Sequence, residues 1–346
     1  MRYTLFGRGT GLRVSEIAMG GALLGDAWGY GTPAQDALRL LHAYEDADGN
    51  FLDTADSYQF GQSETIIGEF LPGRRDRMVL ASKYTLGAGP GHAATTGNSR
   101  RTMVQSVEAS LRRLKTDRID LYWAHMADGQ TSSDEIMRGL DDLIRAGKIV
   151  YAGLSDFPAW RVARAATLAE LRGWAPVIGL QVEYSLVERS ADRELLPMAR
   201  AFGMGITAWS PLGGGLLTGK YRRGEDGRAT TFGHVVHRED DPRKAAVVDA
   251  VLGVAGETGA TPDAVALAWL RARGIVPIIG PRTVEQLRAN LAAADLALSP
   301  DHLARLDAAG AIPGGFPHDF LAAEMQRQGM AGGMADLIDD PAILVA

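Results

Sequence analysis

The fold is decided by a stretch early in the chain that reads Asn50-Phe51-Leu52-Asp53-Thr54-Ala55-Asp56-Ser57-Tyr58. Its apolar beginning predicts a short buried strand, and Asp53 closes that strand. Tyr58 follows in the loop beyond it. The stretch therefore combines a predicted core strand with an acid and a phenol at the strand's carboxyl end.

Two later strands end in the same way. The run Met78-Val79-Leu80-Ala81-Ser82 is closed by Lys83, and the run Ile119-Asp120-Leu121-Tyr122-Trp123-Ala124 is closed by His125. If these strands are parallel neighbours in a barrel, all four polar side chains converge on one rim, which is the end where barrel enzymes carry their chemistry. An acid beside a cation, with a phenol and an imidazole facing them, suits the reduction of a carbonyl group.

Short apolar runs alternate with amphipathic segments along most of the chain. This alternation predicts βαβ units and a parallel sheet, and the number of units fits closure into a (β/α)8 TIM barrel. An N-terminal β-hairpin is expected around Gly7-Arg8-Gly9, and long loops are expected at the C-terminal face. A doubly wound open sheet is the alternative, but no Gly-x-Gly-x-x-Gly motif follows an early strand. Further strands are expected at 149–154, 177–182, 205–209 and 275–279. Helices are expected at 32–48, 63–70, 99–114, 133–146, 159–171, 192–202, 242–257, 262–273, 284–293 and 300–308.

Residues 1–346 are expected to form a single domain, with a core at about 5–309 and a C-terminal tail at 310–346. Two stretches do not fit the alternation, namely the polar, glycine-rich residues 213–241 and the tail, which either covers the barrel mouth or packs outside it. His234 and His237 have helical spacing but lack a carboxylate ligand pattern, so we interpret them as polar loop residues and expect no metal site.

Composition narrows the class of protein. The chain carries 36 basic and 42 acidic residues, a formal net charge of −6, which argues against a nucleic-acid-binding protein because such a surface needs a clustered basic face. The absence of cysteine excludes disulfides and thiolate metal sites. Neither a signal peptide nor a membrane-spanning run is found, so a cytoplasmic enzyme without a membrane partner is expected.

An ordered set of motifs resembles the aldo-keto reductase family over almost the whole chain, roughly residues 5–309. One such motif would be a weak signal, but the common order and spacing make the set specific. The resemblance implies a (β/α)8 barrel, a nicotinamide cofactor that is usually NADPH, and a catalytic set matching Asp53, Tyr58, Lys83 and His125. The matching stretches are residues 50–58, Gly61-Gln62-Ser63-Glu64, Leu111-Arg112-Arg113-Leu114, residues 119–125, Gly153-Leu154-Ser155, Gln181-Val182-Glu183-Tyr184-Ser185 and Trp209-Ser210-Pro211-Leu212.

Carbonyl reduction explains why these residue types are needed. Negative charge develops on the carbonyl oxygen as hydride reaches the carbon, and this charge has to be stabilised and protonated. Tyr58 is the expected acid, and the ammonium of Lys83 is expected to lower the pKa of its phenol, which is ordinarily about 10. Asp53 is expected to keep Lys83 charged, and His125 to donate to the carbonyl oxygen. Taken singly, each of these residues is more often structural, but their joint placement favours catalysis.

The resemblance places the dinucleotide on the later strands. Ser155 and Gln181 match positions that hold the nicotinamide carboxamide, and Trp209 matches an aromatic position that stacks on the nicotinamide ring. Arg282 could clamp a 2′-phosphate, because a guanidinium binds phosphate bidentately, and this favours NADPH over NADH. A surface arginine in a loop is the alternative. The pyrophosphate turn matches Ser210, Pro211, Leu212 and Gly213-Gly214-Gly215, and the adenosine end matches Gly280, Arg282, Gln286 and Asn290.

One position departs from the family pattern. The family usually has Gly-x-Ser-Asn where this chain has Gly153-Leu154-Ser155-Asp156. An ionised carboxylate only accepts hydrogen bonds, so Asp156 could accept from the carboxamide NH2 but could not donate to its carbonyl.

The substrate side is expected to be aromatic. Trp28, Tyr30, Trp123 and Met126 are predicted to form an apolar pocket suited to flat aldehydes or ketones, although core packing is an equal alternative for Trp123. The tail residues Phe316 and Phe320 are expected to complete this pocket.

Two other functions compete with a reductase of aldehydes or ketones. A regulatory barrel would bind the nucleotide with little turnover, as some relatives attached to potassium channels do. A metal-dependent hydrolase would need His and Asp ligands at several strand ends, and only His125 is placed for that. A small carbonyl compound is the expected partner, and a homo-oligomer stays possible from the sequence.

Overall fold

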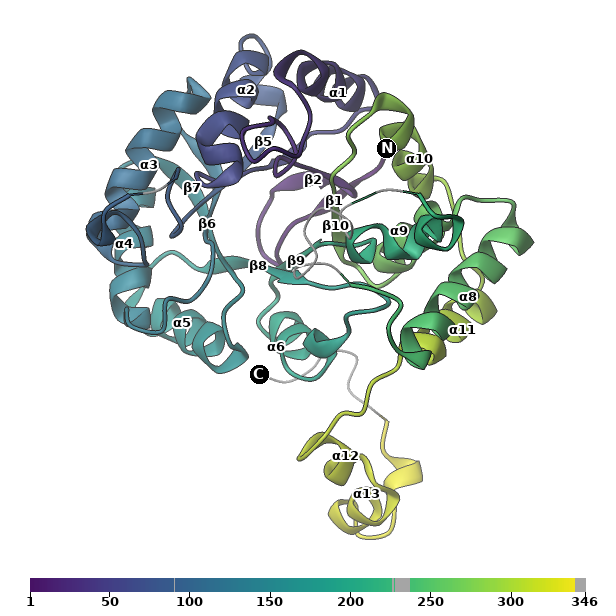
Figure 1. Ribbon diagram of the computed structural model, residues 1–346. Helices are drawn as coiled ribbons and strands as arrows, with labels where there is room; N and C mark the ends of the chain where they lie inside the picture. The colour runs from purple at the N-terminus through teal and green to yellow at the C-terminus, as the bar shows by residue number, and fades with distance from the viewer. Residues whose placement is uncertain (90, 226, 228–236, 340–346) are drawn as a thin grey trace.

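The computed structural model describes residues 1–89, 91–225, 227 and 237–339 (Figure 1). Within these residues, eight parallel strands close into a barrel in the order β10-β3-β4-β5-β6-β7-β8-β9. Closure comes from β10, which pairs with β9 on one side and β3 on the other. The predicted (β/α)8 TIM barrel is therefore confirmed. The barrel strands are β3 (Ala18–Gly20), β4 (Phe51–Asp53), β5 (Val79–Tyr84), β6 (Ile119–Ala124), β7 (Ile149–Ser155), β8 (Val177–Glu183), β9 (Gly205–Trp209) and β10 (Val276–Ile279).

Helices surround the barrel (Figure 1). Their amphipathic patterns explain the arrangement: the third helix, for example, buries Met103, Val107 and Leu111 along one face, and Ser99 caps it by accepting a hydrogen bond from the backbone N–H of Thr102. The helices are α1 (Ala34–Asp46), α2 (Gln62–Phe70), α3 (Arg100–Leu114), α4 (Ser133–Arg145), α5 (Ala159–Arg172), α6 (Leu195–Ala201), α8 (Pro242–Thr258), α9 (Pro262–Ala272), α10 (Val284–Leu291) and α11 (Pro300–Gly310).

The expected N-terminal hairpin closes the end of the barrel where the strands begin. Its strands, β1 (Tyr3–Leu5) and β2 (Arg13–Ser15), pair antiparallel. Phe6 follows β1 into the barrel and meets Phe51 edge-on, with ring centroids 5.6 Å apart. This apolar plug leaves the opposite end, where the strands finish, as the open rim.

Two helices begin later than the sequence predicts. Helix α1 begins at Ala34, because the backbone N–H of Thr32 bonds to the carbonyls of Leu23 and Gly25 and its side chain does not cap the helix. Helix α6 begins at Leu195, because residues Ser190–Asp192 form a separate 3-10 turn, η4. At α1 hydrogen bonds to a neighbouring loop override the local helix-start signal, and at α6 a separate local turn does so.

The glycine-rich segment after β9 contains two short turns, η5 (Gly213–Thr218) and η6 (Lys220–Arg223). Gly214 and Gly215 have φ values of 66° and 95°, a left-handed conformation that glycine adopts without strain. His234 lies outside the described residues. His237 lies beside the barrel, with Nε2 3.0 Å from Oε1 of Glu183.

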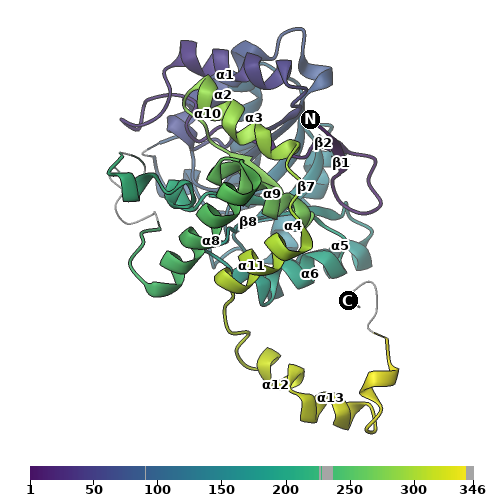
Figure 2. The same ribbon diagram turned by 90° about the vertical axis from the view of Figure 1, so that its right-hand side faces the viewer.

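After α11 the chain leaves the barrel. Helices α12 (His318–Ala322) and α13 (Glu324–Met330) and the turn η8 (Ala335–Leu337) stand away from it in both views (Figures 1 and 2). We call residues 311–339 the C-terminal arm. Phe316 and Phe320 lie in this arm with exposed rings, so the expectation that they complete the substrate pocket is wrong. In the described part of the chain, no helix combines the length and apolarity needed to cross a membrane.

Candidate active site

Four polar side chains meet at the rim, as the strand ends predict. Asp53 ends β4 and Lys83 lies near the end of β5, in neighbouring strands. His125 directly follows β6, and Tyr58 begins the 3-10 turn η1 (Tyr58–Gly61) after β4. Parallel register therefore brings together residues that are up to 72 positions apart in the sequence (125 minus 53).

Lys83 is the centre of this group and is completely buried. Its Nζ donates to Oδ1 of Asp53 in a short ion pair, to the carbonyl of Thr54 at 2.8 Å and to Oη of Tyr58 at 3.2 Å. A lysine ammonium has three donors and no acceptor, so these contacts use all three. Because Lys83 donates to the phenol oxygen, the proton of Tyr58 is not used in this contact and can be donated elsewhere.

The pKa of Lys83 stays above its ordinary value. Burial alone would lower that pKa, but attraction to Asp53 and Tyr58 outweighs burial. Lys83 is therefore charged at neutral pH.

The pKa of Tyr58 corrects our expectation. Burial raises this pKa above 10, and the ammonium of Lys83, which acts in the opposite direction, only offsets part of the rise. The predicted net lowering of the pKa is wrong for the protein without bound ligands. Tyr58 is thus protonated at neutral pH, which is the form that a proton donor needs.

His125 is a neutral imidazole beside the phenol. Burial, together with the charge of Lys83, lowers its pKa to about 3. Its ring meets the ring of Tyr58 edge-on at 5.7 Å, and its Nδ1 is buried without a hydrogen-bond partner among the described residues. A neutral imidazole has one donor and one acceptor nitrogen, so His125 can donate a hydrogen bond to a substrate oxygen without bringing a second cation.

A cavity of about 550 Å³ opens at this rim, with Tyr58, His125 and Asp53 in its wall. This volume lies in the usual range for small-molecule sites. Trp28, Tyr30 and Met126 line it as predicted, and the ring of Trp28 meets the ring of Tyr58 edge-on at 6.1 Å.

Trp123 is the exception among the predicted substrate residues. It is completely buried inside the barrel, where its ring meets Phe6 edge-on at 6.4 Å, and it is not in the cavity wall. Its assignment to the substrate pocket is wrong, because its inward position in β6 lies in the packed layer below the rim.

The loop that carries Trp28 and Tyr30 is held by a residue that sequence reasoning missed. Gln59 is completely buried next to Tyr58 in the chain. Its Oε1 accepts from the backbone N–H of Trp28 at 2.8 Å, and its Nε2 donates to the carbonyls of Ala22 at 3.0 Å and Tyr30 at 3.1 Å. The aromatic wall is therefore fastened to the turn that bears the phenol.

The predicted cofactor residues extend along the same cavity. Ser155 is not in its wall, and it is fully buried, with an Oγ that makes no hydrogen bond within the described residues. The other eleven predicted residues line the cavity: Asp156, Gln181, Trp209, Ser210, Pro211, Leu212, Gly214, Gly280, Arg282, Gln286 and Asn290.

Two of these side chains are already oriented. Nε2 of Gln181 donates to Oδ2 of Asp53 at 2.9 Å, which fixes its amide because a carboxylate only accepts. Oδ1 of Asp156 accepts from Nε1 of Trp209 at 3.1 Å, so the residue that departs from the family pattern holds the indole ring. Burial raises the pKa of Asp156 to about 6, which leaves it mostly ionised at neutral pH.

Arginine and lysine side chains are among the residues that line the cavity. Arg282 lies over the ring of Tyr30 at 4.6 Å, and Asn290 donates to Asp263 at 2.7 Å. Lys220 and Arg223 also line the cavity, and sequence reasoning missed both. The basic run of residues 220–223 directly after the glycine turn was the available signal.

We find no candidate metal centre in the described part of the chain. Among the described residues, no group of three or more His, Asp or Glu side chains is arranged to hold an ion.

Comparison with known proteins identifies the family. The sequence model of the Aldo/keto reductase family matches residues 16–311. The chain belongs to this family. This aldo/keto reductase is 37% identical over 340 residues to the aryl-alcohol dehydrogenase (NADP(+)) of Phanerodontia chrysosporium, covering 92% of the chain and 88% of the relative. It is 35% identical over 322 residues to norsolorinic acid reductase of Aspergillus flavus (90% and 81% covered), and 38% identical over 328 residues to the uncharacterized oxidoreductase YrpG of Bacillus subtilis (91% and 98%).

Family membership settles the class of reaction. This aldo/keto reductase is an oxidoreductase that uses a nicotinamide cofactor and reduces carbonyl groups.

Proposed function

We propose that this aldo/keto reductase reduces aromatic aldehydes or ketones with NADPH, and that Tyr58 donates the proton. One observation carries the proposal: Lys83 donates to the phenol oxygen at 3.2 Å, which leaves the tyrosine proton to be donated into the cavity. Catalysis by a positioned acid requires this combination of a protonated donor and a fixed orientation.

When bound, the reduced nicotinamide supplies the hydride that goes to the carbonyl carbon. Tyr58 and His125 then act on the carbonyl oxygen, because both line the cavity. His125 donates a hydrogen bond to the oxygen as its charge develops, and Tyr58 transfers its proton to it. Lys83 stabilises the phenolate that remains, and Asp53 keeps Lys83 charged and in place.

The residues present fit a nicotinamide cofactor. Among the described residues, the buried Oγ of Ser155 has no hydrogen-bond partner. The Nε2 of Gln181 is held by Asp53, which turns its Oε1 to accept from the carboxamide. Trp209 is held by Asp156 as a flat surface for ring stacking. Arg282, with Lys220 and Arg223 also lining the cavity, supports the preference for NADPH, because a 2′-phosphate adds negative charge to the cofactor.

The aromatic substrate class rests on the wall and the relatives. Trp28 presents a ring next to Tyr58, and Tyr30 lines the same cavity, and flat aromatic compounds pack well on such rings. The names of two relatives, an aryl-alcohol dehydrogenase and a norsolorinic acid reductase, support an aromatic substrate here.

A panel of aromatic and aliphatic aldehydes tests the proposal, with NADPH oxidation followed by absorbance. Tyr58→Phe is expected to lose about 10²- to 10⁴-fold in turnover, the usual contribution of a general acid, with NADPH binding retained. Tyr3→Phe, the same change at an exposed tyrosine, is the matched control and should keep full activity. Turnover by Tyr58→Phe at the wild-type rate would exclude the phenol as the acid. Tight NADPH binding without turnover of any aldehyde would instead support the regulatory barrel.

Two simpler expectations belong to the same proposal. A cytoplasmic location stays a prediction, which cell fractionation would check. We also propose that residues 5–309 unfold as one unit, so that a single transition should be seen in denaturant by both fluorescence and circular dichroism.

A further inference from the structure

The C-terminal arm exposes an unusual share of the chain's large apolar side chains. In the arm, Phe316 is 86% exposed and Leu337 82% exposed, and the remaining large exposed members are Phe320, Leu321, Met325, Met330, Met334 and Ile338. Large apolar side chains exposed together in one short segment are rare on a monomer and mark a site of association.

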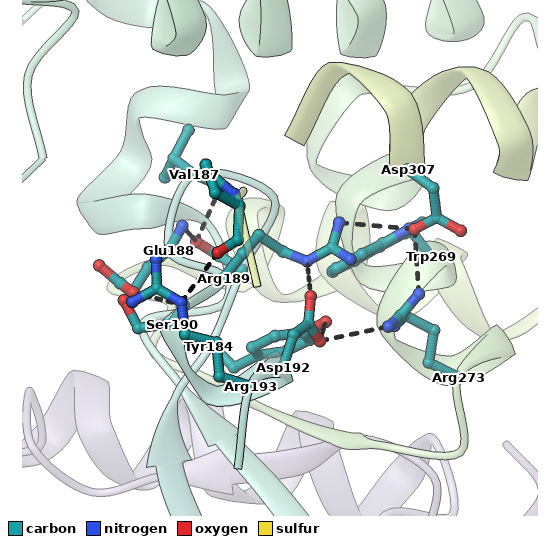
Figure 3. Close-up of polar contacts among 12 residues, drawn as sticks. Tyr184, Val187, Glu188, Arg189, Ser190, Asp192, Arg193, Trp269, Arg273 and Asp307 are labelled. Carbon is teal, nitrogen blue, oxygen red and sulfur yellow. Dashed lines mark hydrogen bonds and ion pairs between the residues drawn. The ribbon is translucent and has the colours of Figure 1, made fainter. Parts of the chain in front are cut away.

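The helix that leads into the arm is firmly held (Figure 3). The rings of Tyr184 and Trp269 stack at 5.5 Å, and the guanidinium groups of Arg189 and Arg273 each lie 5.0 Å from the centre of the Trp269 ring. Asp307 of α11 accepts from Trp269 at 2.9 Å and from Arg273 at 3.0 Å. This cluster fixes α11 to α9 and to the loop after β8, three residues before α11 ends at Gly310.

The first part of the arm is also attached to the barrel. Arg193 donates to the carbonyl of Pro313 at 3.0 Å, and His318 lies 2.8 Å from Glu194. Beyond these contacts, the arm stands off the barrel on the side of α5, α6 and α11 in both views (Figures 1 and 2). Its direction is thus set at the base, while its apolar side chains stay uncovered by its own barrel.

Helix α5, on the same side of the molecule, has a matching surface. Trp160 is 68% exposed and Leu171 is 77% exposed, and their spacing of eleven residues puts them on one face of the helix. Exposed Arg164 and Arg172 accompany them, with Arg200 exposed on neighbouring α6. We call these five residues the α5–α6 face.

The charges of the two surfaces are complementary. Among residues 311–339, four are acidic (Asp319, Glu324, Asp336 and Asp339) and one, Arg327, is basic. The α5–α6 face has three arginines, with Glu170 as an exposed acidic neighbour on α5. Arg164 pairs with Asp134 at 2.9 Å and Glu324 pairs with Arg327 at 3.1 Å, so the complementary charges are Arg172 and Arg200 on the face and the aspartates of the arm. Opposite charges around apolar groups favour one orientation of docking.

We propose that two copies of this chain form a dimer in which the C-terminal arm of each copy docks on the α5–α6 face of the other. A two-fold arrangement makes both contacts at once, because each copy supplies one arm and one face. This pairing covers the exposed apolar side chains of both surfaces, which neither surface achieves within one copy. A second copy is the occupant that the chain itself provides, since both complementary halves are on its surface.

Light scattering coupled to size-exclusion chromatography tests the dimer with the full chain. The wild type is expected at the dimer mass and should dissociate on dilution. Two double variants, Trp160→Ser with Leu171→Ser and Met325→Ser with Met330→Ser, should each weaken the dimer by about tenfold or more, because large apolar side chains dominate interface affinity. Val104→Ser, at an exposed apolar residue of α3, is the control and should leave the dimer unchanged. All these side chains are exposed, so the fold should survive, which thermal melting checks.

Cysteine cross-linking tests the contact itself, and the chain is suited to it because it contains no cysteine. Chains with Leu171→Cys are mixed with chains carrying Met325→Cys, Met330→Cys or Met334→Cys and then oxidised. A disulfide that links one chain of each kind in at least one mixture, and none when Val104→Cys replaces Leu171→Cys, supports the proposal. A monomer at every concentration, a dimer insensitive to both double variants, or the absence of a disulfide between chains of different kind in every mixture would overturn it.

Discussion

Replacement of Lys83 by Met gives the sharpest test of how this site controls its phenol. The Nζ of Lys83 lies 3.2 Å from Oη of Tyr58, and at an effective dielectric constant of about 20 an ammonium and a phenolate at that distance attract by ~5 kcal/mol. This attraction favours the phenolate form of Tyr58. Lys83→Met removes it, and with it the largest influence that lowers the pKa of Tyr58 against the effect of burial. We therefore expect the pKa of the phenol to rise further above its ordinary value.

Alcohol oxidation is the informative assay, because the proposed role of Tyr58 makes it the base in that direction. Its rate should rise with pH until Tyr58 is ionised, and Lys83→Met should move this inflection upward and lower the rate near neutral pH by about a hundredfold. Breaking a buried ion pair also destabilises a protein by about 3–5 kcal/mol, so folding and cofactor binding have to be confirmed first. Lys115→Met, at an exposed lysine, serves as the control. An unchanged inflection in a folded variant would refute the electrostatic coupling of Lys83 to Tyr58.

Three further predictions concern other residues of the site and its surroundings. Arg282→Ala should weaken NADPH binding by about tenfold to a hundredfold, since hydrogen bonds between charged groups contribute ~1.5–3 kcal/mol. The same substitution should change NADH binding by less than about threefold. Equal losses of NADPH and NADH affinity in a fluorescence titration would defeat the phosphate-clamp assignment. Asp156→Asn should lower the ratio of NADP+ to NADPH affinity by about tenfold at high pH, because the carboxylate of Asp156 favours the positively charged oxidised ring. Well below the pKa of Asp156, which is about 6, the substitution should have little effect on this ratio. A ratio that does not change with pH in either protein would contradict this. Asp56→Asn should remove a pH-dependent loss of stability. Burial, with the charge of Glu64, raises the pKa of Asp56 to about 7, so the folded state holds this proton more tightly than the unfolded state. The wild type should therefore lose up to ~4 kcal/mol of unfolding free energy as the pH rises from about 4 to 7. If the unfolding free energies of wild type and variant, measured by denaturation, change in parallel between pH ~4 and ~7, Asp56 does not titrate in that interval.

Strand-end polar residues made the rim predictable from the sequence. Parallel strands all finish at one end of the barrel, so Asp53, Lys83 and His125 had to meet once the βα alternation was recognised. The depth of a residue along a strand is less readable. Trp123 is only two residues before His125, yet it belongs to the packed interior. Alternation predicts which face of the strand a side chain takes, but not which layer of the barrel it occupies.

The pKa of Tyr58 and the course of the arm could not be read from the sequence. The first is a balance between burial and a nearby ammonium, and only the structure shows that burial outweighs the ammonium. The second depends on contacts such as that of His318 with Glu194, which are 124 residues apart. No local pattern at Phe316 says whether its ring faces its own barrel.

Gln59 has a consequence for how substrate range can change. Its three hydrogen bonds join the segment of Trp28 and Tyr30 to the turn of Tyr58, so the aromatic wall and the proposed proton donor are held together. The bonds engage main-chain atoms, which are the same whatever side chain stands at position 28 or 30. New aromatic or aliphatic side chains at those two positions would thus change the width of the pocket, while the hydroxyl of Tyr58 keeps its position.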